Sequence, residues 1–221
     1  MTMGMAPLIT VITPTTGKLS LKKLKESLRT QKVPYIHILL WDDVRDEKAD
    51  RPETYQDEAT LSICLRGRMV QGRAAGSALR AVGLMAANTE YVTFADDDVW
   101  FDDNHLSSLA EAISGKNWVF SLRKIYSPAG EYIGIDRFES IGDETKLPYQ
   151  LVDNNSNMFR RQYGVSAAQF YRETKEYNDD RMMYAFLKQY AGQPGKTGMA
   201  TVNQICPARL EQFFRKNCSL I

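Results

Sequence analysis

Residues 90–103, EYVTFADDDVWFDD, are the most informative stretch of this chain. Their first half, Tyr91 to Ala95, is short, apolar and rich in β-branched and aromatic residues, which is typical of a buried strand. Three carboxylates follow at once, at Asp96, Asp97 and Asp98. Open α/β sheets bind ligands at the edge where their strands end, so we expect this cluster to lie at a binding site.

The charge of this acidic cluster indicates what it binds. Adjacent carboxylates repel one another unless a positive charge lies between them. Mg2+ and Mn2+ prefer oxygen ligands and typically use one or two carboxylates, leaving other positions for water and phosphate. The cluster therefore predicts a site for a metal and a diphosphate. An exposed acidic turn is the alternative, but the preceding strand and the following Trp100 and Phe101 argue against simple exposure.

The residues before the cluster predict a β-α-β unit. We expect strands at 8–13, 35–41 and 61–65, and helices at 20–31 and 71–87, from their apolar periodicity. A β-α-β unit implies parallel strands joined by a right-handed crossover. The second helix carries Arg73 and Arg80 and leads into the central strand.

The residues after the cluster continue the alternation of strands and helices. We expect a helix from 104 to 115, strands at 118–122, 132–135, 156–160 and 199–205, and a last helix from Pro207. Ser166 to Gln169 has the form of a capping box that opens a helix. Asn178 is expected to cap another helix, with Asp179 and Asp180 in its first turn. This alternation predicts the α/β class, with a Rossmann-like, mostly parallel sheet flanked by helices.

Composition limits the possible functions but does not select one of them. The 221 residues suffice for one α/β domain, and their 43% hydrophobic and 25% charged content is ordinary for a globular protein. A formal net charge of +1 provides no global attraction to nucleic acid or anionic membranes. No apolar run approaches the length of a membrane span. Cys64, Cys206 and Cys218 lack metal-site spacing and predict reduced thiols in a cytoplasmic protein.

These segments, in this order, resemble the family 2 glycosyltransferases, which have the GT-A fold. The resemblance covers about residues 7–190 and rests on several short motifs. They are the strand end Thr13-Pro14-Thr15, the pair Asp42-Asp43 after Trp41, the Arg-containing helix segment 78–81, the strand and DXD motif of residues 90–98, the segment 155–161, and Asp179-Asp180 in place of a Glu-Asp motif.

The resemblance implies a fold and an activity. It implies a single GT-A domain over residues 1–221, with a nucleotide-sugar-binding half (1–103) and an acceptor-binding half (104–221). The implied reaction is a metal-dependent, inverting transfer of a sugar from a nucleotide-diphosphate sugar, with a UDP-sugar favoured and Mn2+ or Mg2+ as cofactor. The acceptor could be a glycan, a lipid-linked sugar, a protein or a modified nucleic acid.

The same resemblance assigns roles to the acidic residues. Asp98 matches the second Asp of DXD and is the first choice as metal ligand. Asp96 matches the first Asp, which contacts the ribose, the metal or its water, and Asp97 is the variable position. Asp180 is the candidate general base for the acceptor hydroxyl, and its place at a helix N-terminus predicts an ionised carboxylate. Helix capping alone is the alternative for Asp180.

The donor side is expected to use residues from several segments. Contacts to the nucleotide are implied for Thr13, Pro14, Thr15, Asp96 and Asp97. Asp43 could accept a hydrogen bond from the N3–H group of uracil, or be a turn residue. Arg73 and Arg80 could bind phosphate, because a guanidinium matches phosphate oxygens, or could lie on a solvated helix face.

The chain also departs from the family pattern, and two rival functions remain. Ala81 stands where Asn is usual, Asp179 replaces Glu, and the last third of the chain has no His. A nucleotidyltransferase would share the acidic metal site, but residues 13–18 have one Gly and one Lys where such enzymes need a Gly-rich basic loop. A non-catalytic nucleotide-sugar-binding protein is the second rival, and the presence of both Asp98 and Asp180 argues against it.

Overall fold

The structure is a computed structural model, and it describes residues 9–42, 59–65, 75–137, 151–173 and 179–219. Its strands are β1 (Ile9–Thr15), β2 (Tyr35–Asp42), β3 (Thr60–Leu65), β4 (Tyr91–Phe94), β5 (Val99–Phe101), β6 (Trp118–Tyr126), β7 (Tyr132–Ile135), β8 (Asn157–Arg160) and β9 (Gly195–Ile205). Its α-helices are α1 (Leu21–Arg29), α2 (Ala75–Ala86), α3 (His105–Ala112), α4 (Arg161–Glu173), α5 (Asp179–Phe186) and α6 (Glu211–Asn217). Short 3-10 segments, η2 (Asn154–Ser156) and η4 (Ala208–Leu210), and the π-helical η3 (Leu187–Ala191) complete the described chain.

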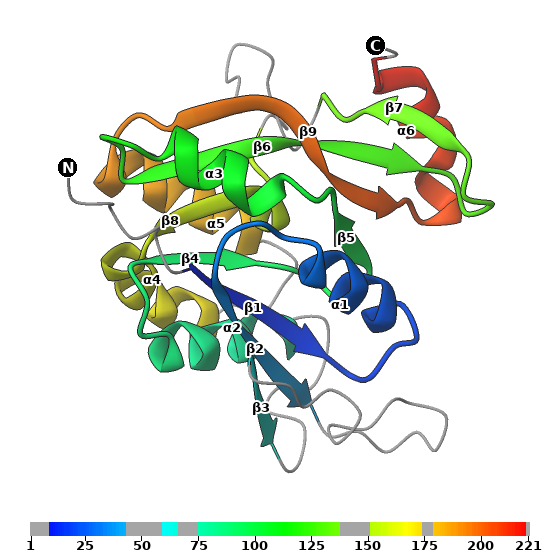
Figure 1. The fold of residues 1–221 in the computed structure, drawn as a ribbon. Helices are drawn as coiled ribbons and strands as arrows, with labels where there is room; N and C mark the ends of the chain where they lie inside the picture. The colour runs from blue at the N-terminus through cyan, green and yellow to red at the C-terminus, as the bar shows by residue number, and fades with distance from the viewer. Residues whose placement is uncertain (1–8, 43–58, 66–74, 138–150, 174–178, 220–221) are drawn as a thin grey trace.

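All nine strands belong to one sheet (Figure 1). Its order is β3-β2-β1-β4-β8-β6-β9-β5, and β7 pairs with β6. The strands β3, β2, β1 and β4 run parallel, whereas β8 enters antiparallel between β4 and β6. Because the first four strands are parallel, their carboxyl ends meet at one edge of the sheet, and the acidic residues after β4 lie there.

Helices cover both faces of the sheet, as Figure 1 shows. Successive side chains of a strand point to opposite faces. Accordingly Val11 belongs to a core that contains the α1 residues Leu21, Leu24 and Leu28, whereas Ile12 belongs to a second core under α2 and α4. The strand β1 is buried along its whole length, which explains its apolar sequence.

Two glycines allow α2 to lie very close to its neighbours. A Cβ atom on Gly83 would lie 2.5 Å from the Cγ2 atom of Ile12 and 2.8 Å from a Leu40 methyl group. A Cβ atom on Gly164, in α4, would lie 2.7 Å from the ring of Phe159. Contacts shorter than 3.0 Å would force neighbouring side chains to shift, so Ala at either position should be destabilising. Close packing thus holds α2, whose first turns carry site residues, against β1 and β2.

The fold class expected from the sequence is confirmed, and so are most of its elements. Strands β6 and β7 form where strands were expected and pair as a hairpin, and Asp179 and Asp180 occupy the first turn of α5. The expectation that Ser166 opens a helix is wrong, because α4 begins at Arg161 and the Ser166 hydroxyl donates back to the Gln162 carbonyl. Asn178 lies outside the described residues. Among the helices that the structure describes, none is long and apolar enough to cross a membrane.

Candidate active site

A cavity of about 440 Å3 lies at the carboxyl edge of the sheet. Its walls come from the ends of β1 and β2, the turn after β4, and the first turns of α2 and α5. The residues that line it are Pro14, Thr15, Thr16, Lys18, Asp42, Gly76, Ser77, Leu79, Arg80, Asp96, Asp97, Asp98, Asp179 and Asp180. The volume is within the usual range for a small-molecule site, and the lining is strongly acidic.

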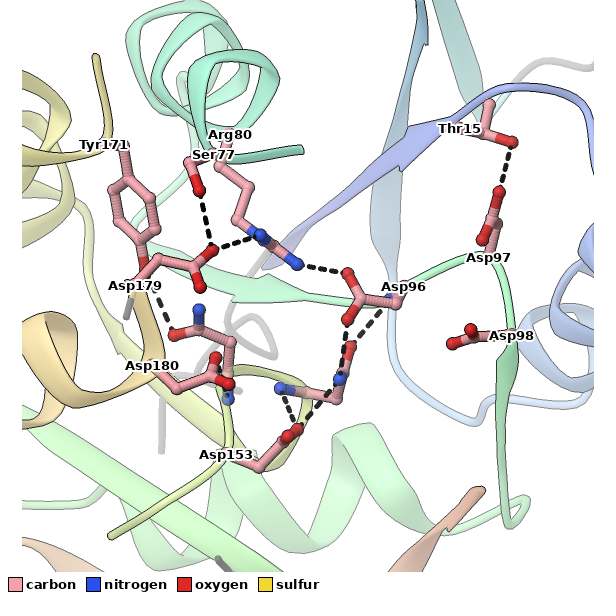
Figure 2. Close-up of polar contacts among 12 residues, drawn as sticks. Thr15, Ser77, Arg80, Asp96, Asp97, Asp98, Asp153, Tyr171, Asp179 and Asp180 are labelled. Carbon is pink, nitrogen blue, oxygen red and sulfur yellow. Dashed lines mark hydrogen bonds and ion pairs between the residues drawn. The ribbon is translucent and has the colours of Figure 1, made fainter. Parts of the chain in front are cut away.

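Asp97 is held by the loop after β1. Its carboxylate accepts from the Thr15 hydroxyl at 2.8 Å (Figure 2) and from the Lys18 ammonium at 2.8 Å, and the residue is only 4% exposed. The Thr15 hydroxyl also accepts from the backbone N–H of Gly17, 2.9 Å away, in the turn that follows. Asp97 therefore fixes the turn after β4 against the turn after β1, and its oxygens are already occupied.

Asp98 presents the most accessible carboxylate of the acidic cluster. Its side chain is 49% exposed, and one of its oxygens lies 3.4 Å from the Lys18 ammonium. Burial and the negative charge of Asp96 raise the pKa of Asp98 above its ordinary value. The pKa is raised although Lys18 opposes the shift, so the site would stabilise an additional positive charge beside Asp98.

Arg80 bridges the acidic cluster and helix α5. Its guanidinium donates to Asp96 and, at 2.5 Å, to Asp179, and both interactions are drawn in Figure 2. Ser77 donates to the same Asp179 oxygen at 3.0 Å. Arg80 is 8% exposed. Arg80 therefore links two carboxylates, and its expected contact with phosphate stays a prediction.

Asn155 forms a second link between the two sides of the cavity. Its side-chain oxygen accepts from the backbone N–H of Asp96 at 2.6 Å. Its amide nitrogen donates to the carboxylates of Asp96 at 3.1 Å and Asp153 at 2.8 Å. Asp96 thus has partners for both oxygens. Burial alone would raise the pKa of Asp96, but Arg80 and Asn155 outweigh it and hold this pKa below its ordinary value.

Asp153 is paired with a buried arginine. Arg123, on β6, donates to Asp153 at 2.7 Å and to Asp136 at 2.6 Å, and it is only 3% exposed. Removing one partner of such a buried ion pair leaves an uncompensated buried charge. The charge of Asp153 also raises the pKa of the neighbouring Asp180.

Asp180 differs from the neighbouring carboxylates in having no charged partner. Among the described residues, its carboxylate accepts one hydrogen bond, from the backbone N–H of Asn154 at 3.3 Å. Burial, Asp153 and Asp179 raise the pKa of Asp180 well above its ordinary value, and Arg80 only partly opposes them. The expectation of an ionised Asp180 stays a prediction, although burial and adjacent negative charge shift the pKa of Asp180 against ionisation.

The donor set fits a metal that arrives with its substrate. No group of three His, Cys, Asp or Glu ligands exists within the described ranges. Asp98 alone offers an accessible carboxylate, while the oxygens of Asp96 and Asp97 are occupied by protein donors. Mg2+ and Mn2+ commonly take one or two carboxylates and complete their shell with phosphate and water. Asp98 would hold such an ion, and the protein supplies too few ligands to hold it alone.

The structure brings together most, but not all, of the predicted donor residues. Pro14 and Thr15 line the cavity, whereas the Thr13 hydroxyl is buried and lies 2.8 Å from the Nε2 atom of His37. Asp43 and Arg73 lie outside the described residues, and the neighbouring Asp42 lines the cavity.

Lys18 and Asn155 are among the residues of the site that were not predicted. In the sequence, Lys18 is only a single Lys in a loop, and no spacing pattern connects it with Asp97. Asn155 lies in a segment that the family resemblance includes, but no sequence pattern assigned it a contact. Another residue near the cluster has no access to the cavity. His105 is buried and stacked on Phe101, and burial lowers its pKa to about 3.

The fold and the site together define a class: an α/β protein whose acidic cavity, at the carboxyl edge of parallel strands, suits a nucleotide-diphosphate ligand. Comparison with protein families gives a specific result. The model of glycosyl transferase family 2 matches residues 10–174, which is well over half of the chain. The chain therefore belongs to glycosyl transferase family 2. Comparison with curated proteins gives no match.

Solved structures of similar fold include TarS of S. aureus. The structure of TarS 1-349 matches with a TM-score of 0.67 at 20% identity, over 89% of this chain and 60% of that one. TarS 1-349 in complex with UDP-GlcNAc matches with a TM-score of 0.64 at 19% identity, over 90% of this chain and 58% of that one. The complex of TarS 1-349 with UDP matches with a TM-score of 0.64 at 19% identity, over 96% of this chain and 67% of that one. This chain spans about three-fifths of TarS 1-349, and the likeness confirms the GT-A fold.

Proposed function

We propose that this protein transfers a sugar from a UDP-sugar to an acceptor hydroxyl, with inversion at the anomeric carbon and with Mn2+ or Mg2+ as cofactor. Membership of glycosyl transferase family 2 supports the reaction class. The choice of UDP is supported by the similar fold of TarS, whose structures include complexes with UDP-GlcNAc and UDP.

One observation carries the proposal: a single cavity contains both Asp98 and Asp180, and neither carboxylate is fully balanced by neighbouring positive charge. Asp98 is accessible and its raised pKa indicates a site that lacks positive charge. Asp180 has no cationic partner among the described residues. Arg80 and Asn155 connect the two sides, so their separation is fixed by buried polar contacts. A donor site and a base at a fixed separation are what a single displacement needs.

The chemistry follows from these positions. The acceptor oxygen attacks the anomeric carbon while Asp180 takes the acceptor proton, and the bond from that carbon to the diphosphate oxygen breaks. The diphosphate leaves with the bonding electron pair. The metal, when bound, neutralises the charge that develops on the diphosphate. The elevated pKa of Asp180 makes it a stronger base once it is ionised, and one displacement with one base inverts the configuration.

The rival functions have less support. A nucleotidyltransferase would need a Gly-rich basic loop, and the loop after β1 instead directs its Lys18 to Asp97 and Asp98. A non-catalytic binding protein would have no use for an uncompensated Asp180. We retain the expected division into a donor half (1–103) and an acceptor half (104–221), the cytoplasmic location, and the four acceptor classes as parts of the proposal.

A screen of nucleotide-sugars tests the proposal. Thermal shifts would be measured with UDP-, GDP-, CMP- and dTDP-sugars, each with and without Mn2+, and then the release of nucleotide and the anomeric configuration of the product by NMR. We expect stabilisation by UDP-sugars that depends on Mn2+ and a product of inverted configuration. A retained configuration would contradict the role of Asp180, and a preference for another nucleotide would contradict the choice of donor.

A further inference from the structure

Lys18 places a positive charge inside the acidic cluster. Its ammonium lies 2.8 Å from an oxygen of Asp97 and 3.4 Å from an oxygen of Asp98. Burial lowers the pKa of Lys18, but the two carboxylates outweigh burial and raise it, so the side chain is fully charged at neutral pH. Lys18 thus occupies the accessible carboxylate that the proposed function assigns to a metal ion.

The charges around the cavity show why this position matters. The described residues that line it include six carboxylates and two cationic side chains, Lys18 and Arg80. A diphosphate brings further negative charge and must meet compensating cations. Arg80 is buried and pairs with Asp96 and Asp179. Of the two cations, Lys18 has the exposed side chain, at 53%, so its ammonium can move without itself becoming a buried, unpaired charge.

The partners of Lys18 would tolerate its departure. Asp97 keeps the hydrogen bond from the Thr15 hydroxyl at 2.8 Å. Asp98 is half exposed, so water or a cation can replace the ammonium. The lysine side chain is a flexible stem with a compact charge, suited to changing partners. Lys18 follows Gly17, whose φ of 84° makes the turn that aims the side chain at the cluster.

We infer that Lys18 is an exchangeable counter-cation of the donor site. In the nucleotide-free protein it neutralises Asp98 and weakens the binding of a divalent cation there. When a metal-bound diphosphate enters, the metal takes Asp98 and the Lys18 ammonium donates to the diphosphate. This inference rests on the proposed donor site. The exchange makes metal and nucleotide binding cooperative, because the metal releases Lys18 for the diphosphate and the diphosphate draws Lys18 away from Asp98.

Titration with Mn2+ in the absence of nucleotide is the decisive test. Free Mn2+ would be measured by electron paramagnetic resonance, at low ionic strength, for the wild type, Lys18→Met and Lys32→Met. Lys32 is the matched control, since its ammonium also lies 3.4 Å from a carboxylate, that of Asp103, and it is not among the residues that line the cavity. We expect Lys18→Met to bind Mn2+ about 10-fold more tightly than the wild type, from the removed repulsion between two cations a few ångströms apart. Lys32→Met should match the wild type.

Two further variants and one further ligand complete the test. Adding Asp98→Asn to Lys18→Met should abolish the gain, and a gain that persists would place the metal elsewhere and overturn the inference. Unchanged or weaker Mn2+ binding by Lys18→Met would also overturn it. With Mn2+ present, Lys18→Met should bind UDP more weakly than the wild type, and equal affinity would refute the transfer of Lys18 to the diphosphate. If the wild type binds no UDP at all, the proposed function fails, while the nucleotide-free titration still decides whether Lys18 competes with the metal.

Discussion

The substitution Asp180→Asn separates the role of a base from the role of a helix cap. Asn keeps an oxygen that can accept from the backbone N–H of Asn154, a contact of 3.3 Å. At low pH, where the Asp180 carboxylic acid and the Asn amide are both neutral, the free energy of unfolding should therefore change by less than about 1 kcal/mol. Loss of a positioned base should slow transfer by about 100-fold or more. Because the acceptor class is open, the assay is release of UDP from a UDP-sugar with water as acceptor.

The neighbouring carboxylate provides the control. Asp179 pairs with Arg80 at 2.5 Å and accepts from Ser77 at 3.0 Å, and it is 9% exposed. Asp179→Asn should therefore lower the free energy of unfolding by about 1–3 kcal/mol, the usual value of hydrogen bonds to a charged group. Urea denaturation measures both variants. If Asp180→Asn is the less stable of the two and still releases UDP at the wild-type rate, Asp180 is a cap and not a base.

The pH dependence of stability gives an independent reading of Asp180. Its pKa in the folded protein is raised, so the folded state holds this proton to higher pH than the unfolded chain, where the pKa is about 3.9. The contribution of Asp180 to stability is therefore lost as pH rises above about 4. Asp180→Asn should gain stability relative to the wild type with increasing pH. UDP release by the wild type should increase with pH as Asp180 ionises, and the variant should lack this increase.

Three other substitutions, one of them with a matched control, test the scaffold of the site. Asn155→Ala removes two hydrogen bonds from Asp96 and should weaken UDP binding about 10-fold in calorimetry, and unchanged affinity would make the link irrelevant to the donor. In urea denaturation, Gly83→Ala should lower the free energy of unfolding by about 1–3 kcal/mol, because the added Cβ atom would crowd β1 and β2. Gly76→Ala in the same helix is the control, since a Cβ atom there would lie 3.5 Å from its nearest neighbour. It should be neutral or stabilising by up to about 1 kcal/mol. Arg123→Met leaves two buried carboxylates unpaired and should cost about 3–5 kcal/mol in the same measurement, and a cost below 1 kcal/mol would contradict the charged state assigned to them.

The sequence predicts the fold well because the decisive signals are local. The apolar strand 91–94 followed by three carboxylates marks the carboxyl edge of the sheet, and the structure has it there. The three-residue strand β5 was not predicted, since Val99 to Phe101 is too short for an alternation to be recognised. Ser166 resembles a helix cap, but packing of α4 against α2 extends the helix back to Arg161. Tertiary contact therefore outweighed the local capping signal.

The site was predictable only in part, because its contacts join distant residues. The motif order placed Asp96, Asp98 and Asp180 in one cavity, as the structure has them. Local patterns could not reveal that Arg80 bridges to Asp179, 99 residues away, or that Lys18 reaches Asp97. The raised pKa of Asp180 was also inaccessible from local patterns. It depends on burial and on Asp153 nearby, whereas a helix N-terminus by itself favours the ionised form.

The central claim is that a metal and a UDP-sugar donor share Asp98. Calorimetric titration of UDP into the wild type and Asp98→Asn, each with and without Mn2+, tests it most directly. We expect Mn2+ to strengthen UDP binding by the wild type at least about 10-fold and to leave UDP binding by Asp98→Asn nearly unchanged. Equal strengthening in both proteins, or no effect of Mn2+ on the wild type, would contradict it.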